Sequence, residues 1–414
     1  MPNPNNTAED RSARALASRR SQHGLDWLNF FIADVQTAFG PFVAVYLASE
    51  GWSPGRIGLV LAIGGIVGIA SQTPGGALVD AVYSKRLLVG VAIGLIAAGA
   101  LLFALSPSFW PVLFAELLHG STGGVIRPAL AGFGLGLVGH RALSGRLGRN
   151  QRFKSFGNAV TAGLMGALGS LSPQLPFVGA AVLCLPAVIS LSMIRRADID
   201  YSEARSAPDR TEPRKSHRLR DAARNRSLHA FILCLVMFQF ANASLVPLAT
   251  GRLGYQHPDM AELVTGAVVL IPELIAGLIA AWIGRRADDW GRKPLLLIGL
   301  GVVSVRGILF AVIPAPWIIL AVQPLDGVSA AVIGVLMPLV IADLTRGTGR
   351  YNLAQGFAGT AMGVGAALST GSSGYVVEHL GYATGFFALA AVGLVGCAIV
   401  CWLVPETKPV TSRR

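Results

Sequence analysis

The chain has 414 residues, of which 53% are hydrophobic and only 14% are charged, and its mean hydropathy is +0.57. A soluble domain carries about a quarter charged residues, so this composition excludes an ordinary soluble protein and indicates one that lies mostly in a lipid bilayer. The net charge of +12 is typical of nucleic-acid-binding proteins, but here the basic residues fall mainly in alternate loops. Membrane topology explains that pattern, and we expect no nucleic-acid partner.

Residues 1–24 are polar and basic, with no apolar signal core before residue 25, so they are expected to form a cytoplasmic tail. Twelve apolar stretches follow, each about as long as the 20 or so residues that cross the hydrocarbon core as a helix. They cover residues 25–48, 55–79, 86–106, 109–139, 154–172, 175–194, 228–251, 261–283, 294–313, 316–343, 353–375 and 382–404.

Lys and Arg are concentrated in every second loop, whereas the opposite loops hold only Arg56 and Arg252. Positively charged loops stay on the cytoplasmic side of a membrane. Both termini are therefore expected to be cytoplasmic, in a protein integral to the cytoplasmic (inner) membrane of a bacterium. The four cysteines lie inside apolar stretches and are expected to act as small buried apolar residues.

One long polar segment, residues 195–227, divides the apolar stretches into six and six. Its Arg, Ser, Asp and Pro content is typical of a flexible linker. The expected organisation is an N-terminal tail (1–24), a six-helix bundle (25–194), a cytoplasmic linker (195–227), a second six-helix bundle (228–404) and a C-terminal tail (405–414).

The two halves repeat weakly. The segment Gly76–Asp80 corresponds to Gly284–Asp288, and Asp34 corresponds to Asn242, both at a spacing of 208 residues. The segment Glu116-Leu-Leu-His119-Gly120 corresponds to Gln323-Pro-Leu-Asp326-Gly327 at a spacing of 207. Matches at nearly the same spacing predict a duplicated six-helix unit with parallel halves.

The segment Gly284–Lys293 reads G-R-R-A-D-D-W-G-R-K. It resembles the signature G-x-x-x-D-x-x-G-R-K between helices eight and nine of the major facilitator superfamily. The first-half copy is degraded, because Tyr83 and Ser84 stand where Gly and Arg are expected. The resemblance implies an all-α membrane protein with the MFS fold, twelve transmembrane helices in two pseudo-symmetric six-helix bundles. It also implies a monomeric secondary transporter that moves a small molecule by alternating access without a cofactor.

In that family, the signature contacts are taken to stabilise the outward-open state. Asp288 at a helix end could face the partial positive charge of a helix N-terminus, and Arg292 or Lys293 could pair with Asp343. The alternative is that these are ordinary cytoplasmic charges beside a solvated Asp288. The expected conformational switch comprises Gly76, Asp80, Lys85, Arg86, Gly284, Asp288, Gly291, Arg292, Lys293 and Asp343.

A charged side chain inside a span costs roughly 2.5–3.5 kcal/mol on insertion scales, so such residues mark functional sites. One or more embedded carboxylates would exchange protons, because burial disfavours their charged form, and Arg127 or Arg306 could attract an anionic substrate. The alternative is a set of structural ion pairs, such as Glu273 with Arg306. The expected substrate and proton cavity comprises Asp34, Gln36, Glu116, His119, Arg127, Gln239, Asn242, Glu273, Arg306 and Asp326.

Glu116 and Arg127 are eleven residues apart and are expected to share a helix face. Glu116 stands where proton-coupled drug antiporters of this family usually carry an Arg, which sets this chain apart from them. Efflux is preferred over uptake of a nutrient or metal chelate, and a transporter-like sensor or lipid-moving protein is the alternative of another class. The sequence has no phosphate-binding loop and no Cys or His cluster, so an ATP-driven pump, an enzyme and a metal site are not expected.

Overall fold

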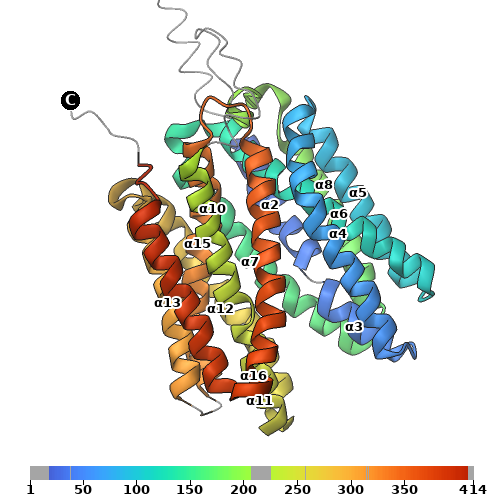
Figure 1. Ribbon diagram of the computed structural model, residues 1–414. Helices are drawn as coiled ribbons and strands as arrows, with labels where there is room; N and C mark the ends of the chain where they lie inside the picture. The colour runs from blue at the N-terminus through green and yellow to red at the C-terminus, as the bar shows by residue number, and fades with distance from the viewer. Residues whose placement is uncertain are drawn as a thin grey trace, which may run out of the picture. The chain divides into compact units, whose positions relative to one another are not determined.

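The computed structural model describes residues 18–37, 39–206, 225–256, 258–313, 315 and 317–408. Within these helices, the side chains of residues 34–42, 45, 54 and 254–266 lie outside the described set. The described residues form helices joined by short turns, without a strand among them (Figure 1). The chain folds as two compact units. Unit 1 comprises Met1–Ser216 and Thr345–Gly356, and unit 2 comprises His217–Leu344 and Phe357–Arg414.

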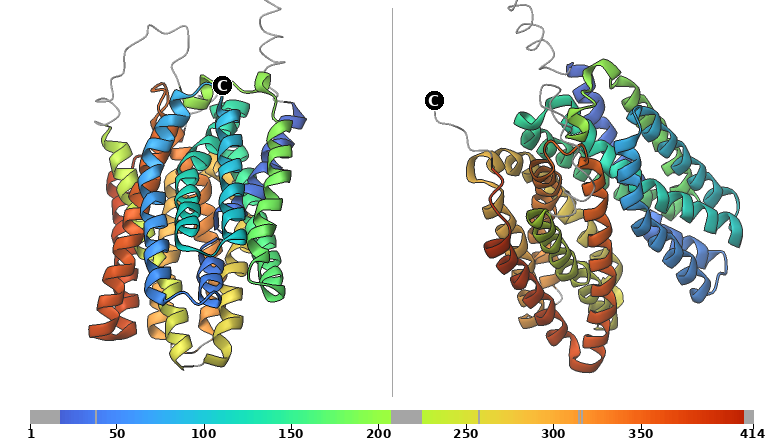
Figure 2. Two further views of the ribbon diagram at one scale, coloured as in Figure 1. Left: turned by 90° about the vertical axis from the view of Figure 1, so that its right-hand side faces the viewer. Right: turned by 45° about the horizontal axis from the view of Figure 1, so that its top comes forward.

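Unit 1 is built from long helices that lie side by side, with short connections at their ends (Figure 2). Three short 3-10 turns complete it: η1 (His140–Ala142), η2 (Arg196–Asp198) and η3 (Glu203–Arg205). Its helices are α2 (Arg19–Thr37), α3 (Phe39–Ser49), α4 (Pro54–Ala81), α5 (Lys85–Leu105), α6 (Phe109–Val138), α7 (Leu143–Leu171) and α8 (Leu175–Met193).

Unit 2 is likewise built from long helices with short connections. Its helices are α10 (Arg226–Ala243), α11 (Leu245–Gln256), α12 (Pro258–Trp290), α13 (Arg292–Val312), α14 (Ile318–Ala321), α15 (Gln323–Leu344) and α16 (Tyr351–Leu403), of which the first residues, up to Gly356, belong to unit 1. The long α16 is two helices joined at Gly381, whose φ of 82° and ψ of 165° are not helical. Glycine tolerates this positive φ without the steric cost of a side chain, so the break falls between the two spans expected at 353–375 and 382–404.

Eight helices among the described residues are long and apolar enough to cross a membrane. They include the double helix α16, but not α6, α7 or the pair α2 and α3. The sequence of α6 includes Glu116 and Arg127, and α7 begins with a basic, polar stretch, Arg146–Lys154; both features lower the hydropathy of these helices. The all-helical fold is confirmed, whereas the number of twelve spans stays a prediction.

The linker expected to be flexible over 195–227 is folded in its first part, which corrects that expectation. Residues 195–206 contain η2 and η3 and belong to unit 1. Residues 207–224 lie outside the described residues. Its polar side chains Arg195, Arg196, Asp200 and Glu203 are exposed, whereas Ile199, Ala204 and Ser206 are buried.

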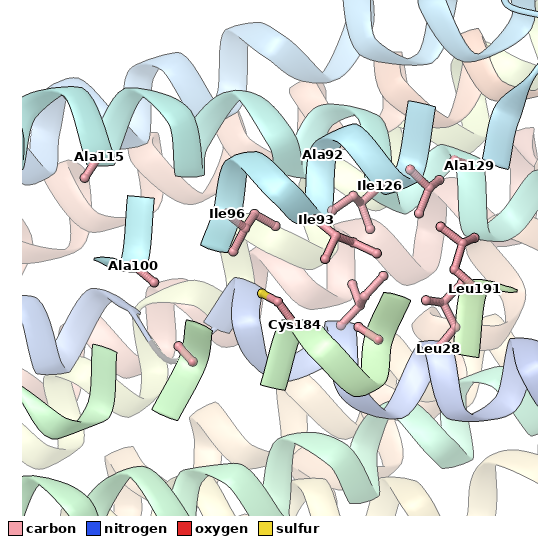
Figure 3. Packing of buried hydrophobic residues seen from close by; sticks show 14 of the residues in the cluster. Leu28, Ala92, Ile93, Ile96, Ala100, Ala115, Ile126, Ala129, Cys184 and Leu191 are labelled. Atoms are coloured by element: carbon pink, nitrogen blue, oxygen red, sulfur yellow. The ribbon is translucent and has the colours of Figure 1, made fainter. Parts of the chain in front are cut away.

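The core of unit 1 forms where α2, α5, α6 and α8 meet (Figure 3). Ile93 and Ile96 of α5 pack with Ile126 of α6 and with Cys184 and Leu191 of α8. Cys184 and Cys234 are buried thiols, as expected, but Cys401 is exposed on α16. Many large apolar side chains point outward on both units. Such a surface is suited to contact with lipid rather than water.

Helices α4 and α6 approach closely through glycines. A Cβ on Gly120 would lie 2.6 Å from the carbonyl oxygen of Gly64, and the Ser71 hydroxyl donates to the Gly120 carbonyl at 3.1 Å. Unit 2 repeats this contact, since a Cβ on Gly327 would lie 2.6 Å from the Pro272 carbonyl oxygen of α12. Gly120 and Gly327 let the helix backbones come into van der Waals contact. Such packing holds helices together in lipid, where no hydrophobic driving force acts between them.

We predict that Gly120→Ala lowers the apparent melting temperature and the folded yield of the purified protein, because its Cβ meets backbone that cannot move aside. The cost expected for such overpacking is about 1–3 kcal/mol. The matched control is Gly123→Ala on the same helix, where a Cβ would meet nothing within 4 Å. Equal melting temperatures for the two variants would contradict the close packing of α4 on α6.

Candidate functional site

A buried charge cluster joins three helices of unit 2. The Arg306 side chain of α13 is fully buried, and its Nη1 donates to Oδ1 of Asp326 on α15 at 2.5 Å. The same nitrogen donates to Oδ1 of Asn242 on α10 at 2.6 Å. The ion pair described for Arg306 is therefore with Asp326, whereas the alternative interpretation of the sequence names Glu273 as an example of a partner. Three residues of the expected cavity thus come together at one point.

The Arg306 guanidinium has unused hydrogen-bonding capacity. Its Nε and Nη2 atoms are buried without a hydrogen-bond partner among the described residues, as is Oε1 of the buried Gln323. Gln323 uses its Nε2 to donate to the Ile319 carbonyl at 2.7 Å. Buried donors are nearly always paired, so the spare nitrogens mark a place where the cluster can accept another partner or rearrange.

Glu116 of α6 is the buried acid of unit 1. Its carboxyl lies against Gly64 of α4, where even a Cβ would collide with it. The described part of the chain provides no hydrogen bond or ion pair to this carboxyl. Arg127, although eleven residues further along the same helix, has an exposed side chain. The two residues therefore have different surroundings in spite of their spacing.

Five further residues of the expected cavity lie on helices of both units. His119, Gln239 and Glu273 are half-buried on α6, α10 and α12. Asp34 and Gln36 belong to α2, but their side chains lie outside the described residues.

The signature segment of unit 2 forms a compact charge cluster where α12 turns into α13. Gly291 makes the turn with a φ of 94°, which favours glycine. The buried Arg292 donates from Nε to Oδ2 of Asp343 at 3.1 Å, so the expected ion pair is present. Arg292 also lies 3.4 Å from the half-exposed Asp288. Lys293 instead donates from Nζ to the Cys401 carbonyl at 2.6 Å, and Gly284 is buried within α12.

Glu406, which follows the last helix, caps the N-terminus of α13. Its Oε1 accepts from the backbone N–H of Arg292 at 2.9 Å, and its Oε2 accepts from that of Lys293 at 3.0 Å. Partial burial raises the pKa of this carboxyl, but the backbone N–H donors of Arg292, Lys293 and Lys408 outweigh it and hold the pKa below the ordinary 4.5. No periodic signal in the sequence indicates this role, and the one hint is a single acid in a basic tail.

Asp80 makes the corresponding helix-capping contact in unit 1. Its Oδ2 accepts from the backbone N–H of Leu353 at 2.8 Å, and its Oδ1 accepts from Nδ2 of Asn352 at 2.7 Å. These residues begin α16, so the carboxylate sits at the partially positive end of that helix. The contact expected for Asp288 is thus made by Asp80. Gly76 lies so close to Asn352 that a Cβ would overlap its carbonyl.

The two basic members of the expected switch in unit 1 differ from each other. Lys85 is fully buried and donates from Nζ to the Val79 carbonyl, at the end of α4. Arg86 is half-buried, and its Nε has no hydrogen-bond partner among the described residues.

We predict that Glu406→Gln lowers the apparent melting temperature by a few degrees at pH 7, measured by nanoscale fluorimetry. The pKa of Glu406 is lower in the folded protein, so its stabilising contribution is complete above the ordinary pKa of 4.5 and is lost as the pH falls through the folded value. The difference between variant and wild type should therefore shrink below pH 4.5. A difference that stays constant down to acid pH would contradict the capping role of the ionised carboxylate.

Comparisons with known proteins agree with the geometry. A family model described as Major Facilitator Superfamily matches residues 26–286 and 256–414. An uncharacterized MFS-type transporter of Mycobacterium tuberculosis is 36% identical over 393 residues, which cover 94% of each chain. The multidrug resistance protein MdtG of Salmonella typhimurium is 25% identical over 339 residues, covering 76% of this chain and 78% of that protein. The crystal structure of the human organic anion transporter MFSD10 has a TM-score of 0.71 at 16% identity, covering 92% of this chain and 99% of that chain. The chain therefore belongs to the Major Facilitator Superfamily and is an integral membrane transporter with the all-helical fold of that family.

Proposed function

We propose that this secondary transporter is coupled to protons and exports a small molecule from the bacterial cytoplasm by alternating access. The observation that carries the coupling is the ion pair between Arg306 and Asp326, which also engages Asn242. A fully buried guanidinium is stabilised only while a carboxylate or another acceptor faces it. Protonation of Asp326 removes that charge, so proton binding and the arrangement of α10, α13 and α15 are linked.

Glu116 is the second candidate for carrying a proton. It is buried between α4 and α6, and no cation is described beside it. A carboxyl in such a place costs less free energy when it is neutral. Loading and unloading of Glu116 would then follow the approach and separation of these two helices. The spare Arg306 nitrogens add the capacity to hold an anionic group of the substrate.

Export is supported by the similarity to the multidrug resistance protein MdtG, which covers three quarters of this chain. The departure of Glu116 from the drug-antiporter pattern keeps uptake of a nutrient or metal chelate as the alternative. We further propose that the protein functions as a monomer in the cytoplasmic membrane, with both termini in the cytoplasm and six spans in each half. The basic residues in alternate loops support this orientation.

The test of coupling uses proteoliposomes that hold a pH-sensitive dye, with ethidium and tetracycline as transport probes. We predict that Asp326→Asn abolishes the dependence of probe movement on the pH gradient, because the cluster no longer titrates, while probe exchange across the membrane without a gradient persists. The control is Asp289→Asn, whose exposed carboxylate pairs with Arg286 on the surface. Probe movement in the wild-type protein that ignores the pH gradient would reject proton coupling.

A second prediction concerns the two signature acids. Asp80→Asn should slow transport about tenfold at near-normal protein level, because it removes a charge-assisted cap from α16. Asp288→Asn should slow it less than about twofold, since Asp288 is half exposed and its ion pair is of the kind that contributes little. Initial rates normalised to protein in the membrane provide the measurement, and full activity of Asp80→Asn would remove the switch role.

A further inference from the structure

The folded start of the linker forms a clasp, residues Ile199–Ser206, on the end of α6. The backbone N–H of Asp200 donates to the Gly136 carbonyl at 2.9 Å. The Asp200 carboxylate accepts from the backbone N–H groups of Ser202 at 2.8 Å and Glu203 at 3.1 Å, which shapes the following turn. Ala204 is fully buried against Gly136, where a Cβ on the glycine would lie 2.9 Å from that of Ala204. The clasp is thus anchored by backbone bonds and by a close fit.

The clasp also binds the segment Thr345–Gly356, which is part of unit 1 although the chain on either side of it belongs to unit 2. The backbone N–H of Gly349 donates to the Ser206 carbonyl at 2.9 Å. Ser206 has a φ of 52°, a conformation that is uncommon for residues other than glycine. The surrounding hydrogen bonds hold it there, so the clasp is shaped to meet this segment.

Asn352 connects the clasp to the capping carboxylate. Its side chain is fully buried, and its Nδ2 donates to Oδ1 of Asp80 at 2.7 Å and to the Ala204 carbonyl at 3.0 Å. An amide nitrogen has two protons, so one group can serve both acceptors. Arg205 adds a bond from Nη1 to the Asp80 carbonyl at 3.3 Å. The linker, the end of α4 and the first turn of α16 therefore meet at one side chain.

We propose that the clasp takes part in opening and closing the cytoplasmic end of the transport pathway, which we call the cytoplasmic gate. Asn352 is the positioning residue that couples the clasp to Asp80. This inference rests on the proposed alternating-access function. The first turn of α16 must leave Asp80 whenever the gate opens, and the Ala204 carbonyl fixes the direction in which Asn352 presents its amide to that carboxylate. Loss of the clasp changes the rate of switching and leaves substrate affinity unchanged.

The first test needs no substrate and uses hydrogen exchange of the full-length protein in nanodiscs, followed by mass spectrometry. Asn352→Ala is expected to raise amide exchange about tenfold both in peptides covering 345–356 and in those covering 197–206, since a buried bond to a charged acceptor is lost. The control is Asn225→Ala, which removes a cap from α10 and a bond to the Leu344 carbonyl without touching the clasp. Unchanged exchange in 197–206 in the Asn352→Ala protein would overturn the coupling.

The second test replaces residues 199–206 by a Gly-Ser sequence of equal length, with the same replacement at 209–216 as the matched control. The first replacement should lower the maximal rate of ethidium or tetracycline transport about tenfold, with the KM within about twofold of wild type. The second should leave both unchanged. Equal rates in the two proteins would show that the linker is only a tether. Failure of the wild type to move either probe would count against the proposed function, whereas the exchange experiment would still decide the role of the clasp.

Discussion

The structure depends on one constraint, which is that a charge removed from water must find its counter-charge or donor inside the protein. Arg306 meets Asp326 and Asn242 in unit 2. In unit 1, the fully buried Asp26 of α2 is held by Arg146 at 2.5 Å and by Arg149, both on α7. The contacts of Arg306 with Asn242 and of Asp26 with Arg146 join helices that are distant in sequence, so a polar requirement helps to fix which helices are neighbours. Under the proposed coupling, a proton on Asp326 would remove the counter-charge of Arg306 and so change the contacts between α10, α13 and α15.

Close backbone contact is the second organising feature. Gly120 in unit 1 and Gly327 in unit 2 occupy matching positions of the internal repeat, and each faces backbone of the preceding long helix, α4 or α12. A duplicated unit has therefore kept the contact that holds its helices together while its polar residues diverged. Where unit 1 has Glu116 and His119, unit 2 has Gln323 and Asp326. Unit 1 has no counterpart of Arg306, because the residues 208 and 207 positions before it are Ala98 and Gly99.

The sequence predicted well what depends on local pattern. Apolar length located the helices, and the signature spacing identified the turn at Gly291 and the pair of Arg292 with Asp343. It predicted less well what depends on distant segments. The sequence offered Glu273 as one possible partner of Arg306, and it did not indicate the ion pair with Asp326, because the approach of α13 to α15 has no sequence signal. Asn352 at the start of α16 and Glu406 after its end were missed because a single polar residue at a helix terminus shows no periodicity. The clasp was expected to be flexible because its composition is polar. Composition does not show that Ala204 and Ser206 are buried and that their carbonyls accept hydrogen bonds from Asn352 and Gly349.

The assignment of Thr345–Gly356 to unit 1 has a consequence for dissecting the molecule. Dividing the gene within the linker (195–227), after Ser206, yields two polypeptides, and each of them lacks residues that its own chain contacts. The amino-terminal fragment keeps Asp80 and the Ala204 carbonyl but lacks the donors on Asn352 and Leu353 that satisfy them. Co-production of both fragments restores these donors in trans. The solubility and lifetime of the amino-terminal fragment alone would then measure how strongly the region around Asp80 and Ala204 depends on the segment Thr345–Gly356.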